Sequence, residues 1–272
     1  MELNTLFVKL WEQYASQIKA AKAIHQLFVD QGEVVVNDHV AFRTFDDTRV
    51  SVDVLAKPFI DLGYHEAGDY EFSVKKLFAK HYEHEDSRQP KVFISQLKTR
   101  EFSPQLQGFV TELVDQIPTE LLEHPAKLLL SGRLWARPQF SRYQKLLAES
   151  EYAAWMYVFG FCANHFTVNV NVLKGFDSIF AVNKFLKANG YQLNSAGGEV
   201  KGTPQDFLEQ SSIMAEQLMV EFEDGPHQIP ASYYEFAKRY EDPATGKLYQ
   251  GFVASSADKI FESTDTQKSK DV

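Results

Sequence analysis

The chain has 272 residues, of which 44% are hydrophobic and 24% are charged, with a net charge of −9 and a pI near 5.4. This length is enough for one large domain or for two fused modules with a shared core. The acidic balance excludes a general nucleic-acid binder, which needs a basic face, and an anionic ligand must therefore be attracted by a local cation.

The first part of the chain predicts alternating helices and strands. An apolar period of 3.6 residues indicates a helix over residues 3–30, and a strand is expected over residues 33–45. A further helix is expected over residues 50–62, although Pro58 should kink or shorten it. Strand-like segments follow at about residues 70–79 and 91–97. These elements predict a first module of strand, helix and strands over about residues 33–100.

The middle of the chain interrupts this pattern. Residues 101–150 are rich in Leu, Glu, Gln and Ala and contain four prolines, which indicates a helical insertion. A second module is expected over about residues 151–255, with a strand at residues 166–172 and a helix at residues 176–188. Asp224-Gly225 is a hairpin signal near its end.

Three further features bear on the environment of the protein. The single cysteine, Cys162, lies in an apolar run and is expected to be a buried structural thiol, so nothing indicates an oxidising compartment. No apolar run reaches the ~20 residues of a membrane span, and residues 1–4 lack the features of a signal peptide. We therefore expect a cytoplasmic protein without a membrane partner. Residues 256–272 are polar and charged and are expected to form a disordered tail.

The two predicted modules share a local pattern. Gly63-Tyr64 follows His39 at nearly the same interval as Gly190-Tyr191 follows His165. Each interval contains an amphipathic helical pattern, and each Gly-Tyr pair stands where that helix should end. Two related modules that face each other would bring His39 and His165 towards one metal ion.

Both histidine-bearing strands also carry a polar stripe. Alternate residues of a strand share a face, so His39, Ala41 and Arg43 point the same way. The second strand has a longer polar face, formed by His165, Thr167, Asn169 and Asn171. Either stripe alone could face solvent. Their equivalent places in the repeat favour a polar cavity instead, because buried polar groups need partners.

The residue types suggest a particular metal site. Neutral imidazole is the commonest metal ligand in proteins, and two histidines with one carboxylate form the facial set of non-haem Fe(II) oxygenases, which leaves open coordination positions. Glu221, Glu223 and Glu235 are the candidate carboxylates, and spacing does not choose among them.

Several motifs resemble the 2-oxoadipate dioxygenase/decarboxylase family, over about residues 5–255. The matching segments are His39-Val40-Ala41-Phe42-Arg43, Glu209-Gln210-Ser211-Ser212, Met214-Ala215 and Tyr234-Glu235-Phe236. The resemblance implies an α+β fold of the vicinal-oxygen-chelate type, in which two βαβββ modules form a half-barrel around a metal.

The resemblance also implies an activity and its residues. His39, His165 and Glu235 would be the catalytic metal ligands for Fe(II), and Arg43 would bind the substrate. The expected reaction converts 2-oxoadipate and O2 into 2-hydroxyglutarate and CO2, in lysine catabolism. The partners are then a small 2-oxo acid and O2, with a homo-oligomer left open.

Other residues are weaker candidates for the site. Gln96 is expected to occupy in the first module the place that Glu235 has in the second, and to point into the cavity. Lys201 and Ser211, with the neighbouring polar residues, are expected to line the substrate site, with an ordinary structural role as the alternative. His81 and His84 stand among charged residues and are expected to be solvated rather than to bind metal.

Two other function classes remain open from the sequence. One is a metal-dependent hydrolase or isomerase on the same scaffold. The other is a non-catalytic small-molecule-binding module.

Overall fold

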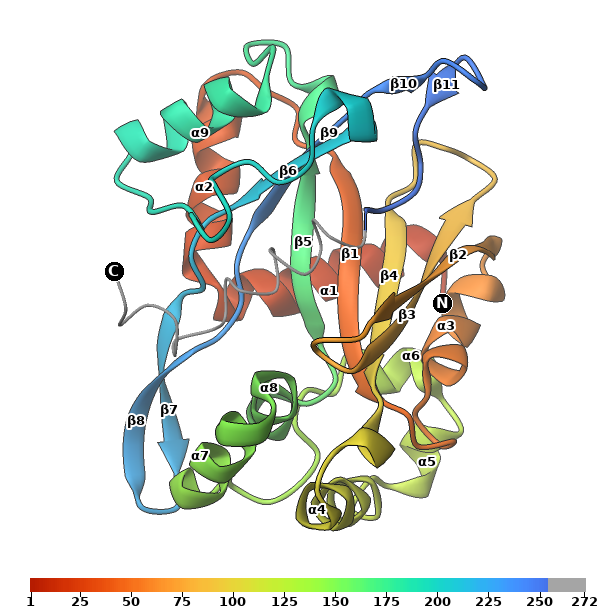
Figure 1. Cartoon of the computed structure of the whole chain (residues 1–272), viewed down its shortest axis with the longest axis vertical. Coiled ribbons are helices and arrows are strands. Elements are labelled where there is room, and N and C mark those ends of the chain that lie inside the picture. Colours follow the sequence, from red (N-terminus) through yellow and green to blue (C-terminus); the bar gives the residue numbers. More distant parts are fainter. Residues whose placement is uncertain (254–272) are drawn as a thin grey trace.

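The computed structural model describes residues 1–253, which fold around a mixed sheet of seven strands in the order β2-β3-β4-β1-β5-β9-β6 (Figure 1). The first half of the chain supplies β1 Asn37–Phe45, β2 Tyr64–Phe72, β3 Leu77–His84 and β4 Lys91–Leu97. The second half supplies β5 Ala163–Asn169, β6 Leu208–Ser212 and β9 Glu235–Arg239. The sheet curls into a half-barrel, and this confirms the expected α+β class. The predicted tail, residues 256–272, lies outside the described residues.

The pairing of the strands shows the internal repeat. In each half, the histidine-bearing strand pairs in parallel with the last strand of its module, β1 with β4 and β5 with β9. The preceding strand then joins antiparallel at the outer side, β3 beside β4 and β6 beside β9. β1 and β5 pair antiparallel and form the seam between the modules. A fourth strand is complete only in the first module, since its counterpart in the second consists of two isolated bridges, Leu193 with Ile213 and Lys201 with Gln210.

Helices cover the convex face of the sheet. These are α1 Leu3–Gln17, α2 Lys19–Asp30, α3 Val52–Ile60 and α9 Ile179–Ala188. Trp11 of α1 packs edge-on against Phe166 of β5 at 5.3 Å between ring centroids, and Phe59 of α3 packs on Phe42 of β1 at 5.7 Å. Because Phe42 and Phe166 alternate with the polar stripes, those stripes face the concave side.

The predicted insertion is helical and lies at one end of the sheet (Figure 1). It contains the 3₁₀ turn η1 Thr99–Glu101 and the helices α4 Pro104–Val114, α5 Thr119–Leu122, α6 Pro125–Leu128 and α7 Phe140–Glu149, followed by α8 Glu151–Phe159. Tyr152 of α8 donates a hydrogen bond to the carbonyl of Ser95 in β4. Gly160 ends α8 at a φ of +67°, where a side chain would clash with the backbone of Gly132. The sharp turn that leads into β5 therefore needs glycine.

Some element bounds differ from the expectations. The first helix breaks at Ile18, where the backbone leaves the helical region (φ −100°, ψ 87°). β1 begins at Asn37 rather than at residue 33, and α3 ends at Ile60 with Pro58 inside it. β5 ends at Asn169, and the 3₁₀ turn η2 Val170–Val172 follows. Asn171 is therefore not part of the strand stripe.

The remaining elements are short. The Asp224-Gly225 signal does form a hairpin, between β7 Gln217–Phe222 and β8 Gly225–Pro230. The 3₁₀ turn η3 Pro204–Asp206 and the strand pair β10 Glu241–Asp242 and β11 Lys247–Leu248 complete the fold. Cys162 is buried as expected, and burial raises the pKa of its thiol to about 12. No helix within residues 1–253 has both the length and the hydropathy to cross a membrane.

Candidate metal centre

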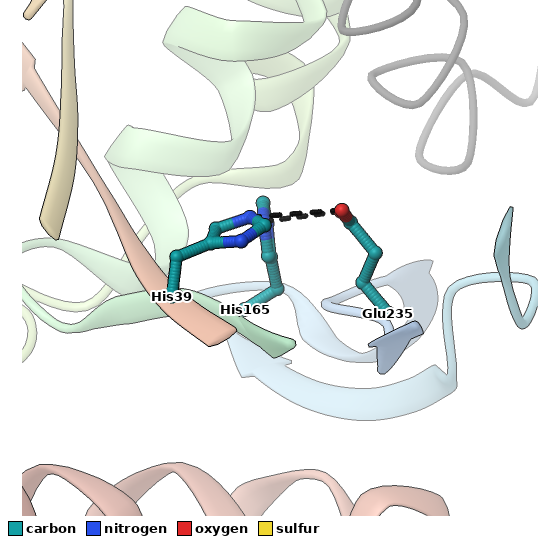
Figure 2. A group of neighbouring side chains, drawn as sticks. All are labelled: His39, His165 and Glu235. Carbon is teal, nitrogen blue, oxygen red and sulfur yellow. Dashed lines mark ion pairs between the residues drawn. The ribbon is translucent and has the colours of Figure 1, made fainter. Parts of the chain in front are cut away.

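The pairing register brings three possible ligands together on the concave face. His39 of β1 pairs with Thr167 of β5, and Thr167 pairs with Glu235 of β9. His165 lies two pairs further along, opposite Ala41, and therefore on the same face of the sheet. Three adjacent strands therefore present His39, His165 and Glu235 to the same point (Figure 2).

The distances between these side chains suit a single ion. His39 Nε2 lies 3.6 Å from Glu235 Oε1, and His165 Nε2 lies 3.2 Å from Glu235 Oε2. The three ligand atoms all lie within 4.8 Å of one another, and the residues are only 1–4% exposed. Ligands bound at about 2.1 Å to a common ion stand about 3–3.5 Å apart. Small side-chain adjustments would therefore complete the site.

Each histidine is oriented by the residue before it in the chain. His39 Nδ1 lies 2.8 Å from Asp38 Oδ1, and His165 Nδ1 lies 3.1 Å from Asn164 Oδ1. A proton on each Nδ1 satisfies these contacts. The Nε2 lone pair of His165 then faces Glu235, and that of His39 faces Glu235 and the Thr167 hydroxyl, which lies 3.0 Å away. Such outer partners fix the tautomer and the ring orientation of metal-binding histidines. The sequence reasoning missed both residues, although an acceptor side chain precedes each histidine in the repeat.

The electrostatics also fit a cation. Burial raises the pKa of Glu235 to about 8, against the opposing hydrogen bond from Gln210. Burial lowers the pKa of His39, and burial with the neighbouring His39 and Arg43 holds the pKa of His165 well below its usual value. Within the described part of the chain, the buried Oε2 of Glu235 has no hydrogen-bond partner. A divalent cation would satisfy this oxygen and the two facing nitrogen lone pairs together.

Arg43 lies on the same strand face as His39, as its spacing predicts, and is 1% exposed. Its guanidinium stacks over the rings of Tyr152 and Trp155, each at 4.9 Å, and Nη2 lies 3.9 Å from Glu151 Oε1. All three of these neighbours belong to α8, which thereby fixes the cation at one end of the concave face.

The expectation for Gln96 is wrong. Gln96 pairs with Thr44 on the opposite face of the sheet, and its Oε1 accepts a hydrogen bond from Val52 N at the start of α3. The counterpart of Glu235 is instead Phe93. Glu235 pairs with the residue two after His165, and Phe93 pairs with Ala41, the residue two after His39.

Ser211 also faces away from the site. Its hydroxyl donates a hydrogen bond to Asn183 Oδ1 of α9, on the convex side. The neighbouring Gln210 faces the site, where its Nε2 donates to Glu235 Oε1 at 2.6 Å. Lys201 bridges to the backbone of Gln210, and its ammonium donates to the carbonyls of Asn194 and Gly198, so it braces the adjoining loop.

The remaining candidate residues, Glu221, Glu223 and His81, lie outside the three-ligand cluster. Glu221 is exposed on the β7–β8 hairpin, and exposed Glu223 accepts a hydrogen bond from Gln139, so only Glu235 of the three carboxylates lies with the histidines. His81 is not solvated as expected. It is 2% exposed and contacts the Tyr70 hydroxyl at 2.9 Å and Glu83 Oε1 at 3.0 Å.

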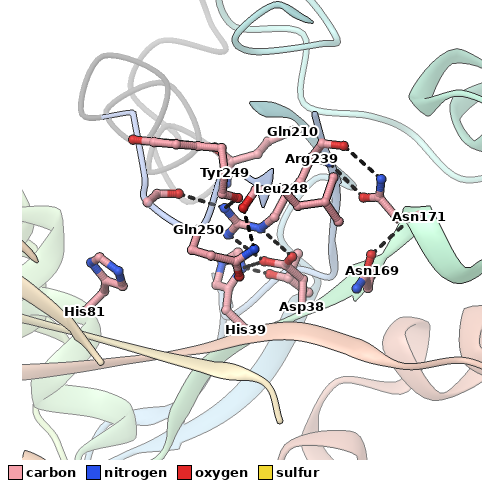
Figure 3. A network of polar contacts seen from close by, with 12 residues as sticks. Asp38, His39, His81, Asn169, Asn171, Gln210, Arg239, Leu248, Tyr249 and Gln250 are labelled. Carbon is pink, nitrogen blue, oxygen red and sulfur yellow. Dashed lines mark hydrogen bonds and ion pairs between the residues drawn. The ribbon is translucent and has the colours of Figure 1, made fainter. Parts of the chain in front are cut away.

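A buried ion pair supports the first histidine (Figure 3). Arg239 Nε and Nη2 donate to the two carboxylate oxygens of Asp38 at 2.7 and 2.9 Å. Arg239 Nη1 also donates to the carbonyls of Tyr249 and Gly251. Burial would raise the pKa of Asp38, but Arg239 and other positive neighbours hold it well below its usual value. Asp38 is therefore a carboxylate at neutral pH, and it strengthens His39 as a ligand.

The comparisons with known proteins agree with this geometry. A sequence model of the 2-oxoadipate dioxygenase/decarboxylase family matches residues 4–244. The chain is 34% identical to the chloroplastic/amyloplastic 2-oxoadipate dioxygenase/decarboxylase of Oryza sativa subsp. japonica, in a match that covers 96% of this chain and 78% of that protein.

Solved structures share the whole fold. Hydroxyglutarate synthase from Oryza sativa, solved with 2-oxoadipate, has a TM-score of 0.90 at 35% identity, over 98% of this chain and 93% of that one. A Shewanella frigidimarina NCIMB 400 protein, provisionally named a hydrolase, has a TM-score of 0.88 at 49% identity, over 93% of this chain and 98% of that one. A glyoxalase-superfamily protein from Ralstonia eutropha JMP134 shares the fold, with a TM-score of 0.71 at 22% identity, over 92% of this chain and 85% of that one. The chain belongs to the 2-oxoadipate dioxygenase/decarboxylase family.

Proposed function

We propose that this protein is an Fe(II)-dependent dioxygenase/decarboxylase that converts 2-oxoadipate and O2 into 2-hydroxyglutarate and CO2. The observation that carries the proposal is the convergence of His39, His165 and Glu235 as a buried set of three donors. Family membership and the relative solved with 2-oxoadipate support the choice of reaction and substrate.

The donor set suits iron better than it suits a closed structural site. Two imidazoles and one carboxylate on one side of an ion are the usual ligands of non-haem Fe(II) oxygenases. Bound Fe(II) would supply the site for the oxo acid and for activation of O2. The chain's own task is then to hold the ligands, to orient the substrate and to exclude water.

The protein residues have separate roles in this proposal. Asp38 and Asn164 keep the two imidazoles neutral and aligned, because each accepts the Nδ1 proton. Arg43 binds the carboxylate at the far end of the substrate through a charge-assisted pair. The rings of Tyr152 and Trp155 hold its guanidinium in place.

The overall reaction balances with these reactants. The C1 carboxylate leaves as CO2. One oxygen atom of O2 enters the new carboxylate at the former keto carbon, and the other becomes the hydroxyl of the shortened acid. Lysine catabolism is the proposed setting, and the cytoplasmic location stays a prediction.

The test is oxygen uptake by protein loaded anaerobically with Fe(II), on addition of 2-oxoadipate. We expect one CO2 released for each O2 consumed, and Glu235→Gln should abolish both. Glu221→Gln is the matched control, because it changes an exposed carboxylate outside the site and should keep full activity. Full activity in Glu235→Gln would refute the proposed ligand set.

A second candidate is a metal-dependent hydrolase or isomerase, which the provisional name of the 49% identical relative favours. Iron bound in stoichiometric amount without oxygen uptake on any 2-oxo acid would favour this class.

A further inference from the structure

The end of the described chain packs against His39, the first histidine of the metal site. Residues 249–252, here called the C-terminal strap, follow the β10–β11 pair, and Tyr249 and Gln250 lie beside Asp38 and Arg239 (Figure 3). Phe252 at the end of the strap is 7% exposed. Its ring meets the imidazole of His39 edge-on, at 4.8 Å between centroids and 90° between planes.

Phe252 fills a definite place in the first module. Its ring lies 5.0 Å from that of Phe93 and 5.3 Å from that of His81, by centroid distances. Phe93 is the first-module counterpart of Glu235, so Phe252 occupies the space on the first-module side of the three-donor set. This space is lined by aromatic and imidazole rings.

The strap is held there by specific contacts. Phe252 N donates to the Tyr70 hydroxyl at 3.1 Å, and that hydroxyl also contacts His81 Nδ1. Arg239 binds the strap carbonyls of Tyr249 and Gly251 while its other nitrogens bind Asp38. The guanidinium carbon of Arg239 lies 5.2 Å from the centre of the Phe252 ring. The side chain that supports His39 through Asp38 thus also places Phe252.

We infer that Phe252 is a specificity-determining residue, whose ring limits the size of the 2-oxo acid that the metal centre accepts. The inference rests on the proposed function and deepens it. Arg43 stands four residues from His39, or about 13 Å along the strand between Cα atoms, on the side of α8. A straight-chain dicarboxylate extends towards that cation and avoids Phe252, whereas an aromatic 2-oxo acid needs the space that the ring occupies.

The experiment compares two ligands on Co(II)-loaded protein under anaerobic conditions, by titration calorimetry. Wild-type protein should bind 2-oxoadipate and should bind phenylpyruvate weakly. Phe252→Ala should bind phenylpyruvate about tenfold or more tightly than wild type, because the ligand ring would replace the lost phenyl ring. Phe252→Leu should show a smaller gain. Leu248→Ala is the matched control, since this residue precedes the strap and is 45% exposed, and it should resemble wild type.

The outcomes separate the two proposals. Binding of 2-oxoadipate without any gain for phenylpyruvate in either Phe252 variant would overturn the inference and leave the proposed function standing. Loss of 2-oxoadipate binding in both variants would also overturn it, because the ring would then support the site rather than limit it. Failure of wild-type protein to bind 2-oxoadipate would instead count against the proposed function.

Discussion

The buried pair of Asp38 and Arg239 offers the sharpest test of how the site is supported. Asp38→Asn keeps the shape and one acceptor oxygen but removes the charge, so Arg239 remains buried and loses its counter-ion. Breaking a buried pair in this way costs about 3–5 kcal/mol. We expect the low end, about 3 kcal/mol, because Arg239 keeps the carbonyls of Tyr249 and Gly251. Weaker support of His39 should also lower metal affinity about 10- to 100-fold.

Two measurements check this prediction. Urea unfolding of metal-free protein gives the change in the free energy of unfolding, and competition with a chelator gives the change in Co(II) affinity. Asp86→Asn is the matched control, since Asp86 pairs with Arg88 at the surface and should have no measurable effect on either quantity. Arg239→Met in the Asp38→Asn background should restore part of the lost stability. Strictly additive losses, or a loss below about 1 kcal/mol for Asp38→Asn, would refute the reasoning.

Three further predictions concern Glu235, Gln96 and Arg43. Metal-free protein should lose about 1.5 kcal/mol of stability between pH 6.5 and pH 8, because the folded state retains the proton of Glu235, whose pKa is about 8, while the unfolded state does not. This stabilisation is complete below the unfolded pKa near 4.5 and is lost as the pH rises through 8; the lowered histidine pKa values act mainly below pH 6.5. Urea unfolding of Glu235→Gln should show no such loss, and a flat wild-type profile would contradict the assignment. Gln96→Ala should cost about 1 kcal/mol in urea unfolding, because Val52 N loses its acceptor at the start of α3, while Co(II) affinity stays unchanged. A tenfold fall in that affinity would return Gln96 to the site. Arg43→Lys should weaken anaerobic 2-oxoadipate binding about 10- to 100-fold, since lysine keeps the charge but loses the planar fork and the stacking; unchanged affinity would remove Arg43 from substrate binding.

The repeat was predictable because its signals are local. Alternating polar and apolar residues define β1 and β5, and glycine follows the end of both α3 and α9. The side-chain periods therefore gave the correct faces for His39 and His165.

For β4, the sequence did not predict in the same way which side chains face the concave side of the sheet. Both faces of this strand are apolar over much of its length, with Val92 and Ile94 on one side and Phe93 on the other. Only the pairing with β1 fixes which residue meets the concave face, and a shift of one residue reverses the side chains. Gln96 was misplaced for this reason.

The burial of His81 depends on a distant part of the chain. Its charged sequence neighbours indicated solvent, but Phe252 packs over it from the end of the described residues. Tertiary contacts of this kind leave no local pattern in the sequence.

The place of Phe93 shows how duplication can change chemistry without changing the fold. Two identical modules would direct two histidines and two carboxylates at the seam, and four protein donors would crowd the ion. Here the strand pairing beside the seam is equivalent in the two modules, but Phe93 stands where the second module has Glu235. That difference leaves one more coordination position for small molecules. A change at one strand position of a duplicated scaffold could thus change the number of protein ligands on the ion from four to three, while both histidines and the seam that carries them remain in place.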